Sequence, residues 1–291
     1  MNDASVSCRL VADVAALHER YVNAQPFPHI AIDDVLAPDV IRQAIAEFPD
    51  LDELQWRNYL HINERKYANM QIDTWGPTLQ AIARYFMSPQ FVGFVEQLTG
   101  ITGLFADPAL DGGGLHRSIA GGYLNVHADF TAHHMHRDWE RRVNLLLYLN
   151  DDWQPDYGGD LELWTRDMQR CVEKIAPIAN RVVLFSTTLD SFHGHPEPLR
   201  TPQGVARKSL ALYYFSENGN APVKSTNYRS RPQDGWRKYL ISADREALHL
   251  YDAMKRRLKL SDDGVSNMLG RIGGKRKDAE GDSHHEPSSS E

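Results

Sequence analysis

An imidazole and a carboxylate two residues apart are the first groups in this chain that could do chemistry together. His127 and Asp129 follow a pair of glycines in the stretch 121–130, GGYLNVHADF, which has the pattern of a short strand. Side chains at i and i+2 of a strand point to the same face, so both would project into whatever that face encloses. Two histidines and one carboxylate form the ligand set of a class of non-haem iron sites. The pair would supply two of those three ligands.

The H-x-D/E triplet is not specific by itself, because the chain has 13 histidines. Four of them begin such a triplet: His127, His136, His195 and His284. His284 lies in a polar tail that we expect to be disordered. His136 lies in a polar run without alternation, which indicates a loop. Only His127 ends a glycine-bounded strand, so its position along the chain favours it.

Two later stretches could complete the site. The apolar run 181–185 is followed by SFHGHP at 191–196, which places His193 and His195 at the end of a strand. Either could be the third ligand, since both face the same side if the chain is extended. Arg207 begins a further strand, and a buried arginine needs an anionic partner, because an unpaired buried charge is costly. A dicarboxylic cosubstrate would supply that partner; a surface position beside Lys208 is the alternative.

Composition places limits on the class of protein. The chain has 291 residues, 42% of them hydrophobic and 24% charged, which is typical of one globular domain of catalytic size. The formal net charge of −7 argues against a nucleic-acid partner. With only Cys8 and Cys171, neither a disulfide framework nor a thiolate metal cage is expected, which favours a reducing compartment. The sequence starts without a signal-peptide pattern and has no run of about 20 apolar residues, so we expect a cytoplasmic protein without a membrane span.

Helical patterns occupy much of the first hundred residues. Apolar spacing predicts helices over 10–21 and 37–47 and a helical region over 77–98, interrupted at Ser88-Pro89. A strand is predicted at 29–33. Beyond residue 103, glycine pairs separate short apolar runs without a helical pattern, which indicates an antiparallel sandwich or barrel, with a jelly roll preferred. The predicted strands are 122–126, 143–149, 160–164, 181–185 and 208–215.

The last part of the chain should be peripheral. Residues 216–235 are polar and predict a loop, and the spacing of apolar residues predicts a helix over 240–258 with a basic end. That basic end is either solvated or in contact with an acidic surface. We therefore divide the chain into a helical support region (1–100), a β core (101–216), a C-terminal loop and helix (217–272) and a disordered tail (273–291).

Taken in order, several stretches resemble iron(II)/2-oxoglutarate-dependent dioxygenases, and the nearest branch is the prolyl 4-hydroxylase-like one, in particular its bacterial members. The resemblance covers roughly residues 26–216 and rests on the ordered set, since each stretch alone is common. It implies an α+β protein with a mainly β core, a double-stranded β-helix (jelly roll) with N-terminal helices packed on the sheet. The stretches are 26–34, 121–130, 142–150, 158–164, 179–185, 191–196 and 207–214.

The resemblance also implies roles for single residues. His127, Asp129 and His193 would bind iron, with His193 favoured over His195 because the family's histidine directly follows the strand. Arg207 would pair with the far carboxylate of 2-oxoglutarate. The other residues expected at the pocket are Tyr148, which would assist that carboxylate, and Asn144, Leu146, Tyr123 and Asn125.

The activity implied is hydroxylation of an unactivated C–H bond, with decarboxylation of 2-oxoglutarate to succinate. It would require iron(II), 2-oxoglutarate and O₂, with ascorbate (vitamin C) as a reductant. The substrate classes open at this stage are proline, other amino acids, peptides and cell-surface sugars, and the oligomeric state is open. The alternative is a non-catalytic cupin-like or lectin-like module that binds a metal.

Overall fold

The computed structural model describes residues 13–51, 56–133, 135–136, 138–217, 226–236, 238–241 and 243. All of them belong to a single compact unit, Met1–Arg245. Most of the helix expected over 240–258, and the whole tail after residue 273, lie outside the described residues. None of the helices that are described could cross a membrane, because none is both long and apolar enough.

Four helices occupy the N-terminal part of the described chain, where the sequence predicts them. Their ends follow from local chemistry: the Asp13 side chain accepts from the backbone N–H of Ala16 (3.1 Å), and Ser88 caps the helix that begins with Pro89. Gly100, with φ of 73°, ends that last helix. The helices are α1 (Val14–Asn23), α2 (Pro38–Ala46), α3 (Pro77–Met87) and α4 (Pro89–Thr99).

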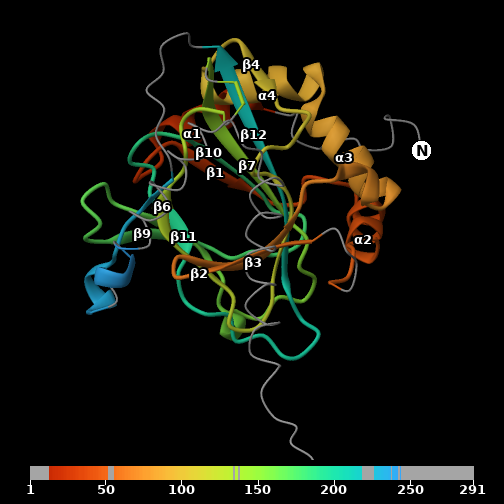
Figure 1. Cartoon of the computed structure of the whole chain (residues 1–291). Helices are drawn as coiled ribbons and strands as arrows, with labels where there is room; N and C mark the ends of the chain where they lie inside the picture. Colours follow the sequence, from red (N-terminus) through yellow and green to blue (C-terminus); the bar gives the residue numbers. More distant parts are fainter. Residues whose placement is uncertain are drawn as a thin grey trace, which may run out of the picture. The chain divides into compact units, whose positions relative to one another are not determined.

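Within the described residues, thirteen strands form one curved antiparallel sheet, and the helices pack against one side of it (Figure 1). The strand order is β1-β10-β7-β12-β5-β3-β6-β11-β8-β9, with β2 paired to β3, β4 to β12 and β13 to β6. The bounds are β1 (His29–Ile32), β2 (Arg57–His61), β3 (Glu64–Asn69), β4 (Leu104–Ala106), β5 (Gly114–Ser118), β6 (Tyr123–Ala128), β7 (Trp139–Tyr148), β8 (Leu161–Trp164), β9 (Cys171–Ile175), β10 (Val182–Ser186), β11 (His193–His195), β12 (Arg207–Glu217) and β13 (Asn227–Tyr228).

Alternation along β7 explains how the sheet separates core from cavity. Leu145 and Leu147 point outward into the main hydrophobic core, where they meet apolar side chains of the helices such as Leu79 and Phe86. Tyr148 points the other way, into a second cluster that contains Leu161 of β8. One face of β7 is therefore covered by helices and the other by the opposite half of the sheet, which is the expected jelly roll.

The hairpin of β2 and β3, which lies between α2 and α3, was not predicted. β3 lies inside the main sheet, paired with both β5 and β6. Its sequence, ERKYAN, has no apolar alternation, because Glu64 and Lys66 are directed into a polar interior. The short strands β4, β5, β9 and β11 were also missed, and β7 and β12 extend beyond their predicted bounds.

Candidate active site

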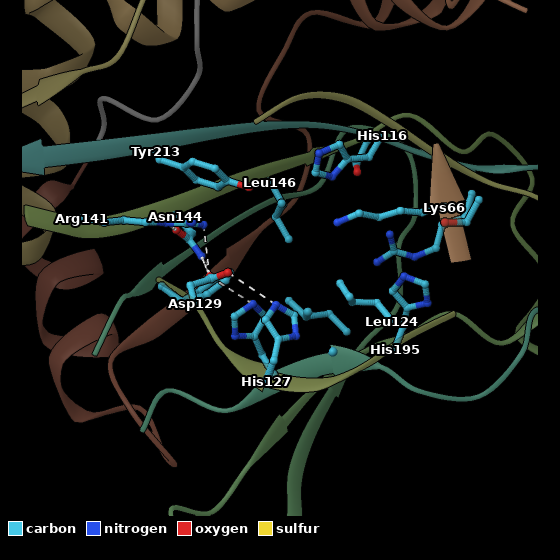
Figure 2. A pocket seen from close by; sticks show the side chains of 17 residues that line it. Lys66, His116, Leu124, His127, Asp129, Arg141, Asn144, Leu146, His195 and Tyr213 are labelled. Atoms are coloured by element: carbon cyan, nitrogen blue, oxygen red, sulfur yellow. Dashed lines mark hydrogen bonds and ion pairs between the residues drawn. The ribbon is translucent and has the colours of Figure 1, made fainter. Parts of the chain in front are cut away.

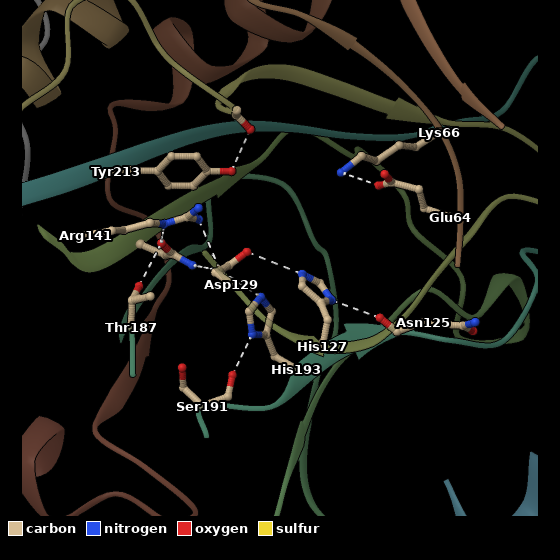
Figure 3. A network of polar contacts seen from close by, with 12 residues as sticks. Glu64, Lys66, Asn125, His127, Asp129, Arg141, Thr187, Ser191, His193 and Tyr213 are labelled. Atoms are coloured by element: carbon tan, nitrogen blue, oxygen red, sulfur yellow. Dashed lines mark hydrogen bonds and ion pairs between the residues drawn. The ribbon is translucent and has the colours of Figure 1, made fainter. Parts of the chain in front are cut away.

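Three potential metal ligands meet between β6 and β11. His127 is near the end of β6, Asp129 directly follows that strand, and His193 begins β11 and is the registered neighbour of His127. Asp129 Oδ1 lies 3.4 Å from His127 Nε2, and Asp129 Oδ2 lies 3.4 Å from His193 Nε2 (Figure 3). One ligand atom from each side chain can be chosen so that all three lie within 4.8 Å of one another.

Backbone carbonyls fix the orientation of both imidazoles. Nδ1 of His127 donates to the carbonyl of Asn125 (2.9 Å), and Nδ1 of His193 donates to the carbonyl of Ser191 (2.9 Å). A carbonyl only accepts, so Nδ1 carries the proton and the lone pair of each neutral ring is on Nε2. Burial lowers the pKa of His193 to about 4, with Asp129 opposing the shift, so the ring is neutral near pH 7. Two imidazole lone pairs and a carboxylate directed at one point fit a divalent iron ion.

The carboxylate of Asp129 is held from its other side by β7. Asn144 Nδ2 donates to Oδ2 at 2.7 Å, and Arg141 Nη2 donates to the same oxygen at 3.1 Å. Burial raises the pKa of Asp129, but Arg141 and the two imidazoles outweigh it and hold that pKa well below its usual range. Asp129 therefore stays ionised and oriented. Asn144, expected at the pocket, lines the cavity and contacts this carboxylate.

A buried arginine lies in the same cavity. Arg207 is 7% exposed; its Nε donates to the carbonyl of Gly159 (2.8 Å) and its Nη2 to the hydroxyl of Tyr148 (3.1 Å). Within the described residues it forms no ion pair with a carboxylate. Gly159 has φ of 77°, and a Cβ there would lie 2.6 Å from Leu199 Cδ2 and 3.1 Å from Arg207 Cδ, so only glycine leaves room for this arrangement. The Arg207 guanidinium is therefore a buried cation without a carboxylate partner among the described residues, and a bound anion could neutralise it.

Some of the other predicted residues line the cavity and others do not (Figure 2). Leu146 and Arg207 line it, as expected, and so does His195 beside His193. Tyr148 is fully buried and reaches the cavity through its hydrogen bond to Arg207. His136 is stacked on Trp139, with ring centroids 4.0 Å apart, and is not among the residues that line this cavity.

The prediction for Tyr123 and Asn125 needs correction. The Tyr123 hydroxyl donates to the carbonyl of Ile62 (3.2 Å), and the Asn125 amide donates to the same carbonyl (3.2 Å), so both side chains bind the turn between β2 and β3. Leu124 lines the cavity instead. The pairing of β6 with β11 shifts register between His127 and Leu124, which interrupts the alternation on which the prediction rested.

Two cations that the sequence analysis did not single out, Lys66 and Arg141, also line the cavity, and Tyr213 lines it as well. Arg141 is only 2% exposed and its guanidinium lies 3.3 Å from the ring centroid of Tyr213. A register shift near its pairing with β12 places Arg141 on the same side as Asn144, three residues away. A prediction based on strict two-residue alternation would place Arg141 on the opposite face from Asn144.

Comparison with known proteins agrees with this geometry. Residues 113–215 match the model of the 2OG-Fe(II) oxygenase superfamily. The chain is 27% identical over 189 residues to prolyl 3,4-dihydroxylase OGFOD1 of Ostreococcus tauri, covering 59% of this chain. It spans 35% of that relative's length, so it corresponds to only part of it.

Two solved structures share the fold. A prolyl-4-hydroxylase of Pseudomonas putida superposes with a TM-score of 0.52 at 19% identity, over 71% of this chain and 100% of that one. A prolyl hydroxylase of Trichoplax adhaerens, solved with a peptide fragment of the oxygen degradation domain of hypoxia inducible factor, gives a TM-score of 0.50 at 20% identity, over 70% and 96%. Residues 113–215 of this chain are therefore similar to the 2OG-Fe(II) oxygenase superfamily, and the chain shares the jelly-roll fold of these two prolyl hydroxylases.

Proposed function

We propose that this protein is an iron(II)- and 2-oxoglutarate-dependent dioxygenase that hydroxylates an unactivated C–H bond. The observation that carries the proposal is the combination of one cavity, three converging ligand atoms and a buried arginine with no carboxylate partner among the described residues. In the reaction, substrate, 2-oxoglutarate and O₂ give hydroxylated substrate, succinate and CO₂, so one oxygen atom enters each organic product.

The roles of the residues follow from their positions. His127, Asp129 and His193 would hold iron(II), which supplies the oxidative decarboxylation and the oxygen transfer when it is bound. Three protein ligands leave the remaining positions to cosubstrate and O₂. Arg207, oriented by Tyr148, would bind the carboxylate of 2-oxoglutarate that lies far from the metal. The residues then orient the cosubstrate and keep water from it.

A prolyl residue, in a peptide or free, is the substrate class we favour. The curated relative is named a prolyl 3,4-dihydroxylase, and the Trichoplax prolyl hydroxylase was solved with a peptide bound. Other amino acids and cell-surface sugars are the weaker alternatives, since a shared fold does not determine a substrate. A bacterial origin of the branch, ascorbate as reductant and a cytoplasmic location remain predictions from the sequence.

Turnover of the cosubstrate tests the proposal. The purified protein, supplied with iron(II), 2-oxoglutarate and air, should release succinate, and a panel of prolyl peptides, free proline, other amino acids and sugars should contain a compound that stimulates the release. Mass spectrometry of that compound should show a gain of one oxygen atom. Metal binding without any succinate release across the panel would favour the non-catalytic metal-binding module.

A further inference from the structure

The end of the cavity that contains Arg207 holds more polar groups than one cosubstrate carboxylate and one arginine require. Lys66 of β3, His116 of β5 and His195 of β11 line it together with Arg207, and we call these four residues the distal cluster. Figure 2 shows Lys66, His116 and His195 pointing into the cavity from different strands. Lys66 lies outside the segment that matches the oxygenase family, residues 113–215, so that match says nothing of it.

The charges of the distal cluster do not balance. Lys66 Nζ lies 2.9 Å from Glu64 Oε2, which compensates one cation (Figure 3). Arg207 has no carboxylate partner among the described residues. Burial, together with the charges of Lys66 and Arg207, lowers the pKa of His116 to about 3, so this ring is neutral near pH 7. The cluster, counted with Glu64, therefore has room for one added negative charge.

His195 supplies the geometric evidence. It is 5% exposed, lines the cavity, and its Nδ1 is a buried nitrogen without a hydrogen-bond partner. An unsatisfied buried polar atom costs about 1–3 kcal/mol, so a ligand atom in the cavity that forms a hydrogen bond with Nδ1 would remove that cost. Its neighbours in the cluster, Lys66 and Arg207, are cations, which favours an anionic ligand.

Arg207 alone cannot satisfy a carboxylate here. Its Nε N–H donates to the Gly159 carbonyl and one N–H of Nη2 donates to the Tyr148 hydroxyl, which leaves three N–H groups, two on Nη1 and one on Nη2, for a ligand. A carboxylate offers about four lone-pair sites, so further donors must come from elsewhere in the cavity. The ammonium of Lys66 and Nδ1–H of His195 are two such donors.

We propose that Lys66 and His195 bind the far carboxylate of the cosubstrate together with Arg207, and thereby select a dicarboxylic 2-oxo acid over a monocarboxylic one. This inference rests on the proposed function. It assigns Lys66 of the unpredicted hairpin to cosubstrate recognition, and it gives the second histidine of the HGH sequence a role other than metal binding.

The test compares two 2-oxo acids on the iron(II)-loaded protein under anaerobic conditions. Dissociation constants are measured by calorimetry for 2-oxoglutarate and for 2-oxobutyrate, which lacks the far carboxylate. In Lys66→Met and His195→Leu, 2-oxoglutarate should bind about tenfold or more weakly, the loss expected for a hydrogen bond to a charged group, while 2-oxobutyrate should change less than about twofold. His195→Asn should recover most of the affinity, because its amide nitrogen can occupy the position of Nδ1. His136→Leu, outside the cavity, is the matched control.

The outcomes separate this inference from the proposed function. Unchanged 2-oxoglutarate affinity in Lys66→Met and His195→Leu, or equal losses for both acids, would overturn the assignment of these two residues and leave the oxygenase proposal standing. If the wild-type protein binds iron(II) but neither acid, both are overturned. Circular dichroism of each variant at the assay temperature establishes that the protein is folded when these constants are measured.

Discussion

Asn144 connects the candidate metal ligand Asp129 to two other side chains, Arg141 and Thr187. Its amide nitrogen donates to Asp129, while its carbonyl oxygen accepts from Arg141 Nε (2.8 Å) and from Thr187 Oγ1 (3.1 Å). Both donor and acceptor functions of one buried amide are therefore used. This arrangement keeps Oδ2 of Asp129 occupied and leaves Oδ1 free to bind a metal.

Asn144→Ala should weaken metal binding without abolishing it. Removal of partners that orient a metal ligand typically reduces affinity about 10- to 100-fold, and Arg141 would still hold the carboxylate. Competition between the protein and a chelating dye for iron(II) or manganese(II) measures the change. Thr187→Val, which removes only the outer hydrogen bond, should cost much less. Equal affinities for wild type and Asn144→Ala would show that the amide does not position the ligand.

At this scale the sequence predicted the residues that follow simple alternation. His127 and Asp129, at i and i+2, share a face in the structure, and His193 joins them. Tyr123 was misplaced because the pairing of β6 with β11 shifts register between Leu124 and His127, and Arg141 was missed because β7 has a similar irregularity. Both irregularities depend on pairing between strands that are distant in sequence, so they cannot be recognised from the pattern of apolar and polar residues within one strand.

Close packing between β6 and β11 holds the two histidines in register. At Gly194, between His193 and His195, a Cβ would lie 2.7 Å from the carbonyl oxygen of Leu124 and 3.0 Å from that of Asn125. Any side chain would push the two strands apart. The glycine is therefore required by the site and not by a turn.

Gly194→Ala should destabilise the fold and separate the candidate ligands. We expect a loss of about 2 kcal/mol in the free energy of unfolding, typical of overpacking, together with weaker metal binding. Urea denaturation and metal titration measure the two effects. Gly93→Ala is the matched control: it lies in α4 with nothing within 4 Å of its Cβ, and should stabilise the helix by about 0.5–1 kcal/mol. Similar stability changes in the two variants would contradict this description of the strand contact.

Elements with an apolar face were predicted, whereas three of the strands that contribute to the cavity, β3, β5 and β11, were not. The helices α2 and α3 begin at prolines and bury one side, so spacing and start signals identify them. β3 has polar residues on its inner face because Glu64 and Lys66 line or border the cavity, and the three-residue strand β11 is too short to carry a pattern. The polar residues that β3 contributes to the cavity region thus remove the apolar alternation by which that strand could have been predicted.

The ion pair of Glu64 and Lys66 couples the cavity to the stability of the whole molecule. Burial raises the pKa of Glu64, but the charge of Lys66 and the hydrogen bond from His61 outweigh it and hold that pKa below its usual value of 4.5. A carboxyl group whose pKa is lower in the folded state than in the unfolded state stabilises the fold at pH values above the unfolded-state pKa. That contribution is lost as the pH falls toward the folded-state pKa. The pair should therefore contribute its full stabilisation above about pH 4.5, and that contribution should decrease progressively as the pH falls from 4.5 toward the lower pKa of the folded protein.

Glu64→Gln tests this dependence in the metal-free protein. At pH 7 the variant should unfold with a free energy roughly 3 kcal/mol lower, since a buried ammonium loses its partner. The difference from wild type should shrink progressively below pH 4.5, because the Glu64 carboxyl of the unfolded wild-type chain takes up a proton there while that of the folded protein is still ionised. Urea denaturation at intervals from pH 7 to acid measures it. A difference that stays constant over this range would show that the charge of Glu64 does not contribute.

As a whole molecule, the protein should bind iron(II) and 2-oxoglutarate together in one site. Anaerobic absorption spectroscopy tests this most directly. Adding iron(II) and then 2-oxoglutarate to the protein should produce a visible metal-to-ligand charge-transfer band that saturates at one equivalent of each. His127→Ala should abolish the band, while His136→Ala, at the other triplet, should keep it. Absence of the band in the wild-type protein, or its loss in His136→Ala with retention in His127→Ala, would contradict the account.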